Sequence, residues 1–508
     1  MLEAIRQDLL VFVLSAAGLS ALVGVGEALR AWGRVSAEGS RRVVHAGVGV
    51  FVAITPYLFT RPDLVYALAA VFVVVNYATL RRGWFRGIHG TARRSLGTVT
   101  FPLALLPALV VAWSADSGRV FALQMAFLIL AFSDPLASVV GMRLGRRKAL
   151  PEGVSTKTIA GSAAFFVSAS MLSLGALFWF RAEGQIDWSA GETVAAAVVV
   201  AMVTTAVEAL GRRGWDNFFI VLAALVTLIV FDEQATARLV LLGAVAIGLV
   251  FGVIAHRLRF LDRSGSIAGG LLAASVIGLG GWVWAVPSFT FFVLSSLLSR
   301  LGKRRKAAAA ATEKGSRRDA AQVYANGGVG WTLLLVFAVF PAEVLYWGFL
   351  GAFAAATADT WATEIGTLSS KPPRLVTTWR EAPRGTSGAV SVVGTLGALA
   401  GAFVIGLSAW PFVMGRVTSP GWAALAVVMG GFVGAFVDSL AGATVQARFR
   451  DPQTGAETER SASAAGAHSL IRGWRWFRND HVNWLCTFTG ATFAMACFQA
   501  TNFSYFVF

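Results

Sequence analysis

The chain consists of long runs of hydrophobic residues separated by short polar loops. We interpret these runs as membrane spans, because a helix of about 20 apolar residues crosses a bilayer. The pattern predicts an all-α integral membrane protein with about 16 transmembrane helices. The expected spans are 9–30, 43–60, 64–80, 96–113, 119–140, 158–180, 192–210, 216–231, 238–256, 266–281, 285–299, 326–340, 344–363, 387–410, 421–446 and 481–505.

The positive charges alternate between the loops. We place the N-terminus outside. Of the 43 Lys and Arg residues, all but six then fall in the inner loops or at the inner ends of the spans. The six exceptions are Arg6, Arg61, Arg119, Arg181, Arg238 and Arg416. The positive-inside rule then predicts that both termini are outside and that the basic loops are cytoplasmic. We expect a protein of the bacterial inner (cell) membrane with active sites on the cytoplasmic face.

Composition supports this class. A hydrophobic fraction of 56% and a mean hydropathy of +0.67 exclude an ordinary soluble domain. The net charge of +16 lies in short loops, where it sets the topology and meets anionic lipid headgroups. Membrane lipids are therefore expected partners, and nucleic acid is not.

The acidic loop Phe231-Asp232-Glu233-Gln234 predicts a boundary between two membrane domains, 1–236 and 237–508. Short motifs recur in both halves and predict two related helical modules. In the loops, the Ala-rich run 307–311 predicts a short basic interfacial helix. Residues 451–466 are small and polar, which favours a linker over a mobile flap.

Acidic residues at the ends of apolar spans are the first candidates for chemistry. An ionisable side chain in or beside a membrane span is costly unless it is paired or coordinated. Any single acid could simply pair with an arginine or cap a helix, but seven are expected on one membrane face. Oxygen ligands converging from several helices suit Mg²⁺. The expected catalytic acids are Asp134, Glu208, Asp359 and Asp438, and the expected metal ligands are Asp134, Asp216, Asp359, Glu364, Asp438 and Asp480.

Two segments of small residues supply the complementary half of such a site. The segments 155–158 and 385–388 are each expected to place backbone N–H groups and hydroxyls at a helix N-terminus, which favours phosphate. Ordinary helix capping by Ser or Thr is the alternative, and neither segment is a P-loop. The expected phosphate-binding residues are His45, Lys157, Thr158, Gly161, Gly385, Thr386, Ser387 and Gly388. Together with the acids they indicate phosphoryl or nucleotidyl transfer to a lipid-borne acceptor.

These motifs resemble two known families. The first half is similar to the dolichol kinase/phytol kinase group of membrane lipid kinases, through Arg41-Arg42-Val43-Val44-His45, Asp134-Pro135, Lys157-Thr158, Gly161-Ser162, Glu208 and Asp216-Asn217. The second half resembles the membrane family that includes plant phytyl-phosphate kinase. Its matching motifs are Arg318-Asp319-Ala320, Asn326-Gly327-Gly328, Asp359-Thr360-Trp361, Gly385-Thr386-Ser387-Gly388, Asp438-Ser439 and Asn479-Asp480.

The resemblance implies a fusion of two consecutive kinases. The first would phosphorylate an isoprenoid alcohol such as phytol, and the second would convert the monophosphate to the diphosphate, with CTP or another nucleoside triphosphate as donor and Mg²⁺ as cofactor. It also implies that Arg318 and Asn326 bind phosphate. Two alternatives remain open: a CTP-dependent lipid nucleotidyltransferase, and a transporter built from related halves with intramembrane acids.

Overall fold

The computed structural model describes residues 2–84, 95–113, 118–145, 147–150, 157–233, 235–301, 317–414, 420–453, 455, 457–459, 461–463 and 466–500. Within these ranges the protein is mostly helical. The helices are α1 (Leu2–Ala31), α2 (Ala37–Leu58), α3 (Asp63–Arg82), α5 (Gly97–Ala112), α6 (Val120–Leu144), α7 (Ile159–Ala182), α8 (Ala190–Leu210), α9 (Asp216–Asp232), α10 (Ala235–Arg257), α11 (Arg263–Leu301), α13 (Ala320–Val339), α14 (Glu343–Gly366), α15 (Val392–Val413), α16 (Pro420–Thr444) and α17 (Asn479–Ala500).

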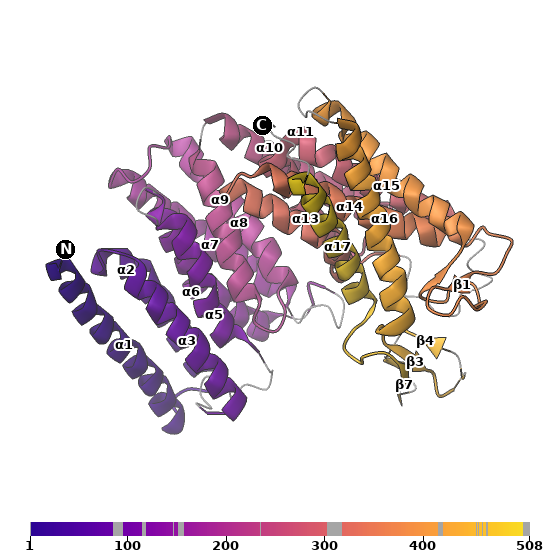
Figure 1. Ribbon diagram of the computed structural model, residues 1–508. Coiled ribbons are helices and arrows are strands. Elements are labelled where there is room, and N and C mark those ends of the chain that lie inside the picture. The colour runs from indigo at the N-terminus through magenta and orange to yellow at the C-terminus, as the bar shows by residue number, and fades with distance from the viewer. Residues whose placement is uncertain are drawn as a thin grey trace. The chain divides into compact units, whose positions relative to one another are not determined.

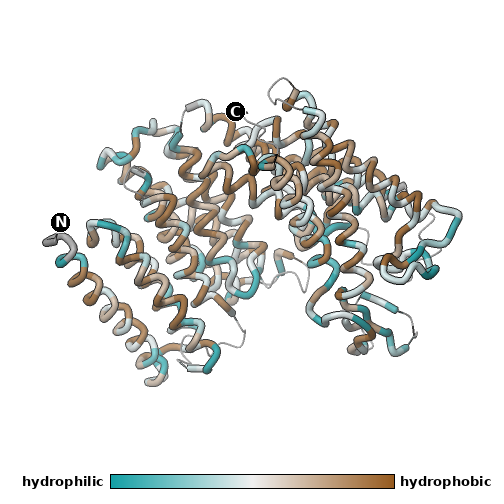
Figure 2. Tube along the Cα trace, viewed as in Figure 1, coloured by the Kyte–Doolittle hydropathy of each residue, from teal (hydrophilic) through white to brown (hydrophobic). Residues whose placement is uncertain are grey.

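Each expected span coincides with a helix or with part of one. Ten helices among the described residues are long and apolar enough to cross a membrane. Figure 2 shows hydrophobic residues along the helices and hydrophilic residues gathered at their ends and in the loops. The expectation of a helical integral membrane protein is therefore confirmed, while sixteen crossings and external termini stay predictions.

Helix α11 covers two of the expected spans in one element. Its backbone leaves the helical region at Gly281, where φ is 61° and ψ is −161°. This left-handed φ is one that glycine adopts without steric cost. The break thus falls at the end of the expected span 266–281.

Two expectations in the loops are wrong. Helix α15 begins at Val392 rather than at residue 387, because Gly385 and Gly388 have φ of 82° and 80°. These two residues form a turn, and β1 (Arg374–Leu375) pairs with β2 (Ala389–Val390) beside it. The segment 451–466 is not a plain linker either, since it contributes strands to small sheets. The remaining strands are β3 (Arg448–Arg450), β4 (Glu457–Thr458), β5 (Ala462–Ser463), β6 (Gly466–Ala467) and β7 (Ser469–Arg472).

The reason for the second error is a buried aromatic side chain. Phe449 in β3 is fully buried, and β3 lies between β4 and β7 in a three-stranded sheet. Thr458, which pairs with Phe449 from β4, is also buried. A buried face favours one register, and the polar composition of the segment does not reveal it. The expected interfacial helix at 307–311 lies outside the described residues.

The chain forms two compact units, Met1–Leu242 and Gly243–Phe508. In unit 1, α6 is the most enclosed helix and packs against α2, α5, α7 and α9 (Figure 1). Helix α1 is largely exposed, and its main packing partners are α2 and α3. Such exposure of apolar helix surface fits contact with lipid. A functional division at 236/237 stays a prediction.

In unit 2, α14 is the central helix and packs against α11, α13, α15, α16 and α17 (Figure 1). Small residues allow this density. A Cβ atom added to Gly351 of α14 would collide with the carbonyl oxygen of Gly490 in α17, and one on Gly490 would lie 3.2 Å from the carbonyl oxygen of Gly430 in α16. Close crossings at small residues are common between membrane helices, because no hydrophobic driving force acts between them in lipid and close packing stabilises their association.

Candidate active sites

The first site in unit 1 is a lysine surrounded by three carboxylates, here called the Lys157 centre. Lys157 Nζ lies 2.7 Å from Glu208 Oε1, 2.9 Å from Asp216 Oδ2 and 3.6 Å from Asp134 Oδ1. The three acids come from three helices, at the end of α8, the start of α9 and within α6. The structure thus brings together four of the residues that the sequence singled out in the first half.

Local sequence explains how the lysine reaches this position. Thr158 is the N-cap of α7 and its hydroxyl accepts a hydrogen bond from Gly161 N at 3.1 Å. A Cβ atom on Gly161 would lie 3.0 Å from Ala137 O and 3.3 Å from Gly141 Cα. The glycines therefore allow α7 to start directly against α6, which places Lys157, the residue before the cap, beside Asp134.

The Lys157 centre is largely shielded from solvent. The side chain of Glu208 is 2% exposed, whereas that of Lys157 is 23% exposed. Burial lowers the pKa of Lys157, but the negative charges of Asp216, Asp134 and Glu208 outweigh it and raise the pKa well above its usual range. Ser162 Oγ donates a hydrogen bond to Glu208 Oε2 at 3.2 Å. Lys157 is therefore a fixed positive charge at physiological pH.

Two arginines at the start of α2 interact electrostatically with this centre. Arg41 interacts with Asp216, and Arg42 interacts with Asp134. Arg42 Nη2 also donates to Ser138 Oγ in α6 at 3.1 Å. Arginines near a lysine at a helix N-terminus are the groups expected to receive a polyphosphate.

Two expected phosphate ligands have other partners in this structure. His45 Nε2 lies 3.0 Å from the carbonyl oxygen of Leu130, to which it donates, and its ring packs edge-on against Phe101. The Thr158 hydroxyl caps α7, which is the alternative that the sequence left open. Ser155 and Thr156 lie outside the described residues.

The second site, in unit 2, is built on a carboxyl pair formed by Asp359 and Asp438. Asp359 lies in α14 and Asp438 in α16, and their carboxyl groups are close enough to interact electrostatically. Asp438 Oδ2 is buried and receives no N–H or hydroxyl hydrogen bond from the described residues. Two partly buried carboxyls that adjoin each other favour a shared proton or cation, because two adjacent negative charges repel each other.

A polar network adjoins the carboxyl pair at the end of α16; we call it the Gln446 network. Ser387 donates a hydrogen bond to Gln446 Oε1, and Gln446 Nε2 donates to Glu459 Oε1 at 3.0 Å. Arg448 Nη2 lies 3.3 Å from the same Glu459 oxygen. Glu459 is within electrostatic range of Asp438. The network therefore connects the turn 385–388 to the surroundings of the carboxyl pair.

The sequence predicted a helix N-terminus at Gly385, Thr386, Ser387 and Gly388. This prediction is wrong, because these residues form a turn. Instead Ser391 caps α15, accepting from Gly394 N. Gly388 lies directly against Ala443 of α16, and the Thr386 hydroxyl donates to Pro383 O at 2.8 Å. The turn is thus docked on α16, one helical turn beyond Asp438.

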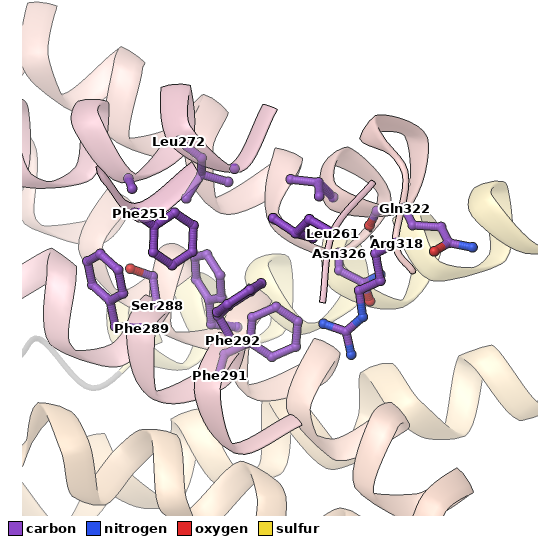
Figure 3. Close-up of a pocket in the computed structure, with 15 residues that line it drawn as sticks. Phe251, Leu261, Leu272, Ser288, Phe289, Phe291, Phe292, Arg318, Gln322 and Asn326 are labelled. Atoms are coloured by element: carbon purple, nitrogen blue, oxygen red, sulfur yellow. Dashed lines mark hydrogen bonds between the residues drawn. The ribbon is translucent and has the colours of Figure 1, made fainter. Parts of the chain in front are cut away.

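A pocket with about 530 Å³ of empty space, open solvent at its mouth included, lies between α10, α11, α13 and α14 (Figure 3). Its wall is mainly apolar. Figure 3 shows Phe251, Phe289 and Ser288 at one end, Phe291 and Phe292 in the middle, and Arg318, Gln322 and Asn326 at the other end. Gln322 and Asn326 are one turn apart on one face of α13, and Arg318 precedes Asp319, the N-cap of that helix. The expected phosphate ligands Arg318 and Asn326 therefore line a common cavity.

Arg318 has an unusual environment. Its guanidinium carbon lies 5.9 Å from the ring centre of Phe291, and its side chain makes no hydrogen bond or ion pair with a described residue. Burial lowers the pKa of Arg318, and the charge of Glu364 in α14 counteracts this. A shielded guanidinium without a direct acidic partner is suited to an anionic ligand. Asn326 Nδ2, by contrast, already donates to Gln322 O at 2.9 Å.

The acids expected to bind metal were tested for fit. No group of three or more His, Cys, Asp or Glu side chains in the described part of the chain is arranged to hold a metal ion. Glu364 lies at the end of α14 and Asp480 in the first turn of α17. Mg²⁺ needs only one or two carboxylates, with water and substrate phosphates completing its shell. The carboxyl pair fits that requirement, with a buried oxygen that lacks a donor.

Several polar residues at the second site were not predicted from the sequence, notably Gln446, Arg448 and Glu459. They lie after the last residue of α16 or in the segment interpreted as a linker. The one available signal was Phe449, a large aromatic residue between two arginines in an otherwise polar stretch. In unit 1, Ser162 was part of a motif but had no assigned role.

Comparison with known proteins supports membership of a membrane family. The family described as integral membrane protein DUF92 matches residues 246–491, which lie within unit 2. An uncharacterised membrane protein of Methanocaldococcus jannaschii is 33% identical over 38% of this chain and 78% of its own length. No solved structure matches the chain.

Other relatives carry names that refer to an activity. A probable chloroplastic phytol kinase 2 of Glycine max is 30% identical over 46% of this chain and 79% of its own length. A phytol kinase of Synechocystis is 29% identical over 42% of this chain and 87% of its own length. Residues 246–491 therefore belong to the DUF92 family of integral membrane proteins, and homologues of the chain include proteins named phytol kinase.

Proposed function

We propose that this protein is a membrane-embedded kinase that phosphorylates a prenyl alcohol such as phytol in unit 1 and the resulting monophosphate in unit 2. The observation that carries the proposal is the Lys157 centre, in which three helices direct carboxylates at one shielded ammonium group. Relatives named phytol kinase support the choice of acceptor. CTP is the proposed phosphoryl donor, by the family resemblance of the sequence motifs.

The proposed reaction in unit 1 is a direct transfer. The alcohol oxygen attacks the γ-phosphorus of the nucleotide, the bond to the bridging oxygen breaks, and the nucleoside diphosphate leaves. The hydroxyl proton passes to a carboxylate. We assign this role to Asp134, because it lies farthest from Lys157 Nζ of the three acids, at 3.6 Å. Lys157, Arg41 and Arg42 would neutralise the phosphates, which is the main catalytic requirement in phosphoryl transfer.

Glu208 has a different proposed role. It lies 2.7 Å from Lys157 Nζ and is almost fully buried, so we assign it to positioning the lysine. Asp216 would hold Mg²⁺ in unit 1, and Asp359 and Asp438 would hold it in unit 2. When bound, the metal would offset the negative charge of the phosphates.

In unit 2 the acceptor is the prenyl monophosphate. One of its oxygens would attack the γ-phosphorus of a second nucleotide, giving the diphosphate and a second nucleoside diphosphate. The Asp359–Asp438 pair and the adjoining Gln446 network are the groups available to bind the donor there. Because the intermediate is a lipid, it can move between the two sites within the membrane.

The test uses purified protein with Mg²⁺, γ-labelled CTP and either phytol or phytyl phosphate, with products separated by charge. We expect label in the monophosphate from phytol and in the diphosphate from phytyl phosphate. Label from phytyl phosphate alone would remove the proposed role of unit 1. Release of pyrophosphate without labelled lipid would instead establish nucleotidyl transfer, and absence of any turnover would return the transporter to consideration.

Variants assign the two steps to the two units. Asp134→Asn is expected to abolish the first phosphorylation and to leave the second intact, and Asp359→Asn is expected to do the reverse. Asp187→Asn is the matched control, because the side chain of Asp187 is 93% exposed. If either active-site variant lost both activities while remaining folded, two independent sites would be ruled out.

A further inference from the structure

We propose that the pocket between α10, α11, α13 and α14 binds a phosphorylated prenyl lipid, with the hydrocarbon chain among the phenylalanines and the phosphate at Arg318. This inference deepens the proposed function and rests on it, since it names the acceptor site of the second step. Neither the sequence motifs nor the known relatives identify the residues that hold the chain.

The wall of the pocket fits a hydrocarbon. Phe251 of α10 and Phe289, Phe291 and Phe292 of α11 contribute rings, and Leu272 adds an aliphatic surface (Figure 3). The space among these side chains opens to the outside, so a long chain need not be enclosed along its whole length. Each buried methylene group adds to the affinity, so a long chain gains far more from such a wall than a short one.

The polar end fits a phosphate. Arg318 is held by its backbone, whose N–H donates to Phe260 O and whose carbonyl accepts from Asp262 N, both at 3.0 Å. Its guanidinium has no ion-pair partner among the described side chains, and Phe291 restricts it on one side at 5.9 Å. In an apolar cavity such a group binds an anion strongly, since little water competes. A cavity with one charged end and one aromatic end matches an amphipathic lipid.

The wall also limits the length of the hydrocarbon chain that the pocket can hold. Phe289 and Phe251 lie at the end of the cavity opposite Arg318 (Figure 3), and Ala273 lines the space between helices. A larger residue at Ala273 should shorten the available space. A smaller residue at Phe289 should lengthen it.

The first experiment compares acceptors of two lengths in the full-length protein. Ala273→Phe is expected to raise KM for a C20 prenyl phosphate about tenfold or more, which corresponds to the loss of roughly two buried methylene groups. KM for a C5 prenyl phosphate should change less than about twofold. Val293→Phe is the matched control, since it adds an aromatic ring to the same helix at a side chain that is 45% exposed. Equal effects on both acceptors, or none on either, would overturn the assignment.

The second experiment does not depend on turnover. A C20 prenyl phosphate with a photoreactive diazirine at its terminal isoprene unit is expected to label the α10 and α11 peptides, and Arg318→Gln should reduce that labelling while Arg318→Lys retains part of it. Excess unlabelled prenyl phosphate should prevent labelling of these peptides, and phosphatidylglycerol vesicles should not. Equal protection by both would identify a general phospholipid site and contradict the acceptor role.

The two hypotheses fail differently. Labelling outside α10, α11, α13 and α14 would disprove the pocket assignment even if the kinase reaction were established. Conversely, absence of phosphoryl transfer to any prenyl acceptor by the wild-type protein would disprove the proposed function, whatever the labelling pattern.

Discussion

At the scale of single residues, the Lys157 centre is the least expected arrangement. The sequence indicated Lys157 as a phosphate ligand and the three acids as catalytic or metal-binding residues, but not that they contact one another. Their separation in the chain, from residue 134 to residue 216, means that only helix packing can bring them together. The residue types were predictable from the cost of ionisable groups in membranes; the pairing was not.

A first prediction concerns stability. Glu208→Gln removes the carboxylate closest to Lys157 and should reduce the free energy of unfolding by about 3 kcal/mol, the lower end of the range for breaking a buried ion pair. The lower end applies because Asp216 remains 2.9 Å from Lys157 Nζ. Thermal unfolding in detergent measures the effect, with the exposed Glu183→Gln as control. Identical melting temperatures would show that the pair contributes nothing net.

A second prediction concerns pH. The pKa of Lys157 is raised in the folded protein, so its charge stabilises the fold fully below the unfolded value of about 10.4. The contribution is lost only as the pH rises through the still higher folded value. The difference in melting temperature between wild type and Lys157→Met should therefore be constant from about pH 6 to pH 9 and shrink above about pH 10.5. A difference that varies within the neutral range would implicate another group.

At the scale of elements, the sequence predicted helices well and the connections between them poorly. Apolar periodicity identifies a span because the bilayer demands satisfied backbone hydrogen bonds along its whole length. The start of α15 was misplaced because glycines in a turn and glycines in a helix start look alike in one dimension. The three-stranded sheet was missed because its buried side chains are few: Phe449 and its cross-strand partner Thr458.

The turn 385–388 offers a matched pair of substitutions. Both Gly385 and Gly388 have positive φ, so alanine at either should cost about 1–2 kcal/mol of backbone strain. Gly388 also abuts Ala443, whereas nothing lies within 4 Å of a Cβ atom at Gly385. Gly388→Ala should therefore displace the turn and reduce the second phosphorylation at least tenfold, while Gly385→Ala reduces it much less. Kinetics with phytyl phosphate compare the two. Equal losses would mean that contact with α16 is irrelevant.

At the scale of the whole molecule, charge distribution predicts topology directly. If the basic loops are cytoplasmic, Arg317 lies inside and Gln185 outside, and both are exposed. Single cysteines at these positions, in a chain with Cys486 and Cys497 replaced, should react with an impermeant maleimide from opposite sides of the membrane. Labelling of both from the same side would refute the predicted sixteen-span arrangement.

The crossing of Gly351, Gly430 and Gly490 has a consequence for genetics. Three helices of unit 2 approach each other where a single methyl group would meet a carbonyl oxygen. Overpacking of such a contact costs about 1–3 kcal/mol. In a saturation screen for function, the lowest tolerance should therefore appear at these glycines as well as at the acids. Alleles that inactivate this protein will then often be alanine or serine changes at buried glycines that take no part in the chemistry.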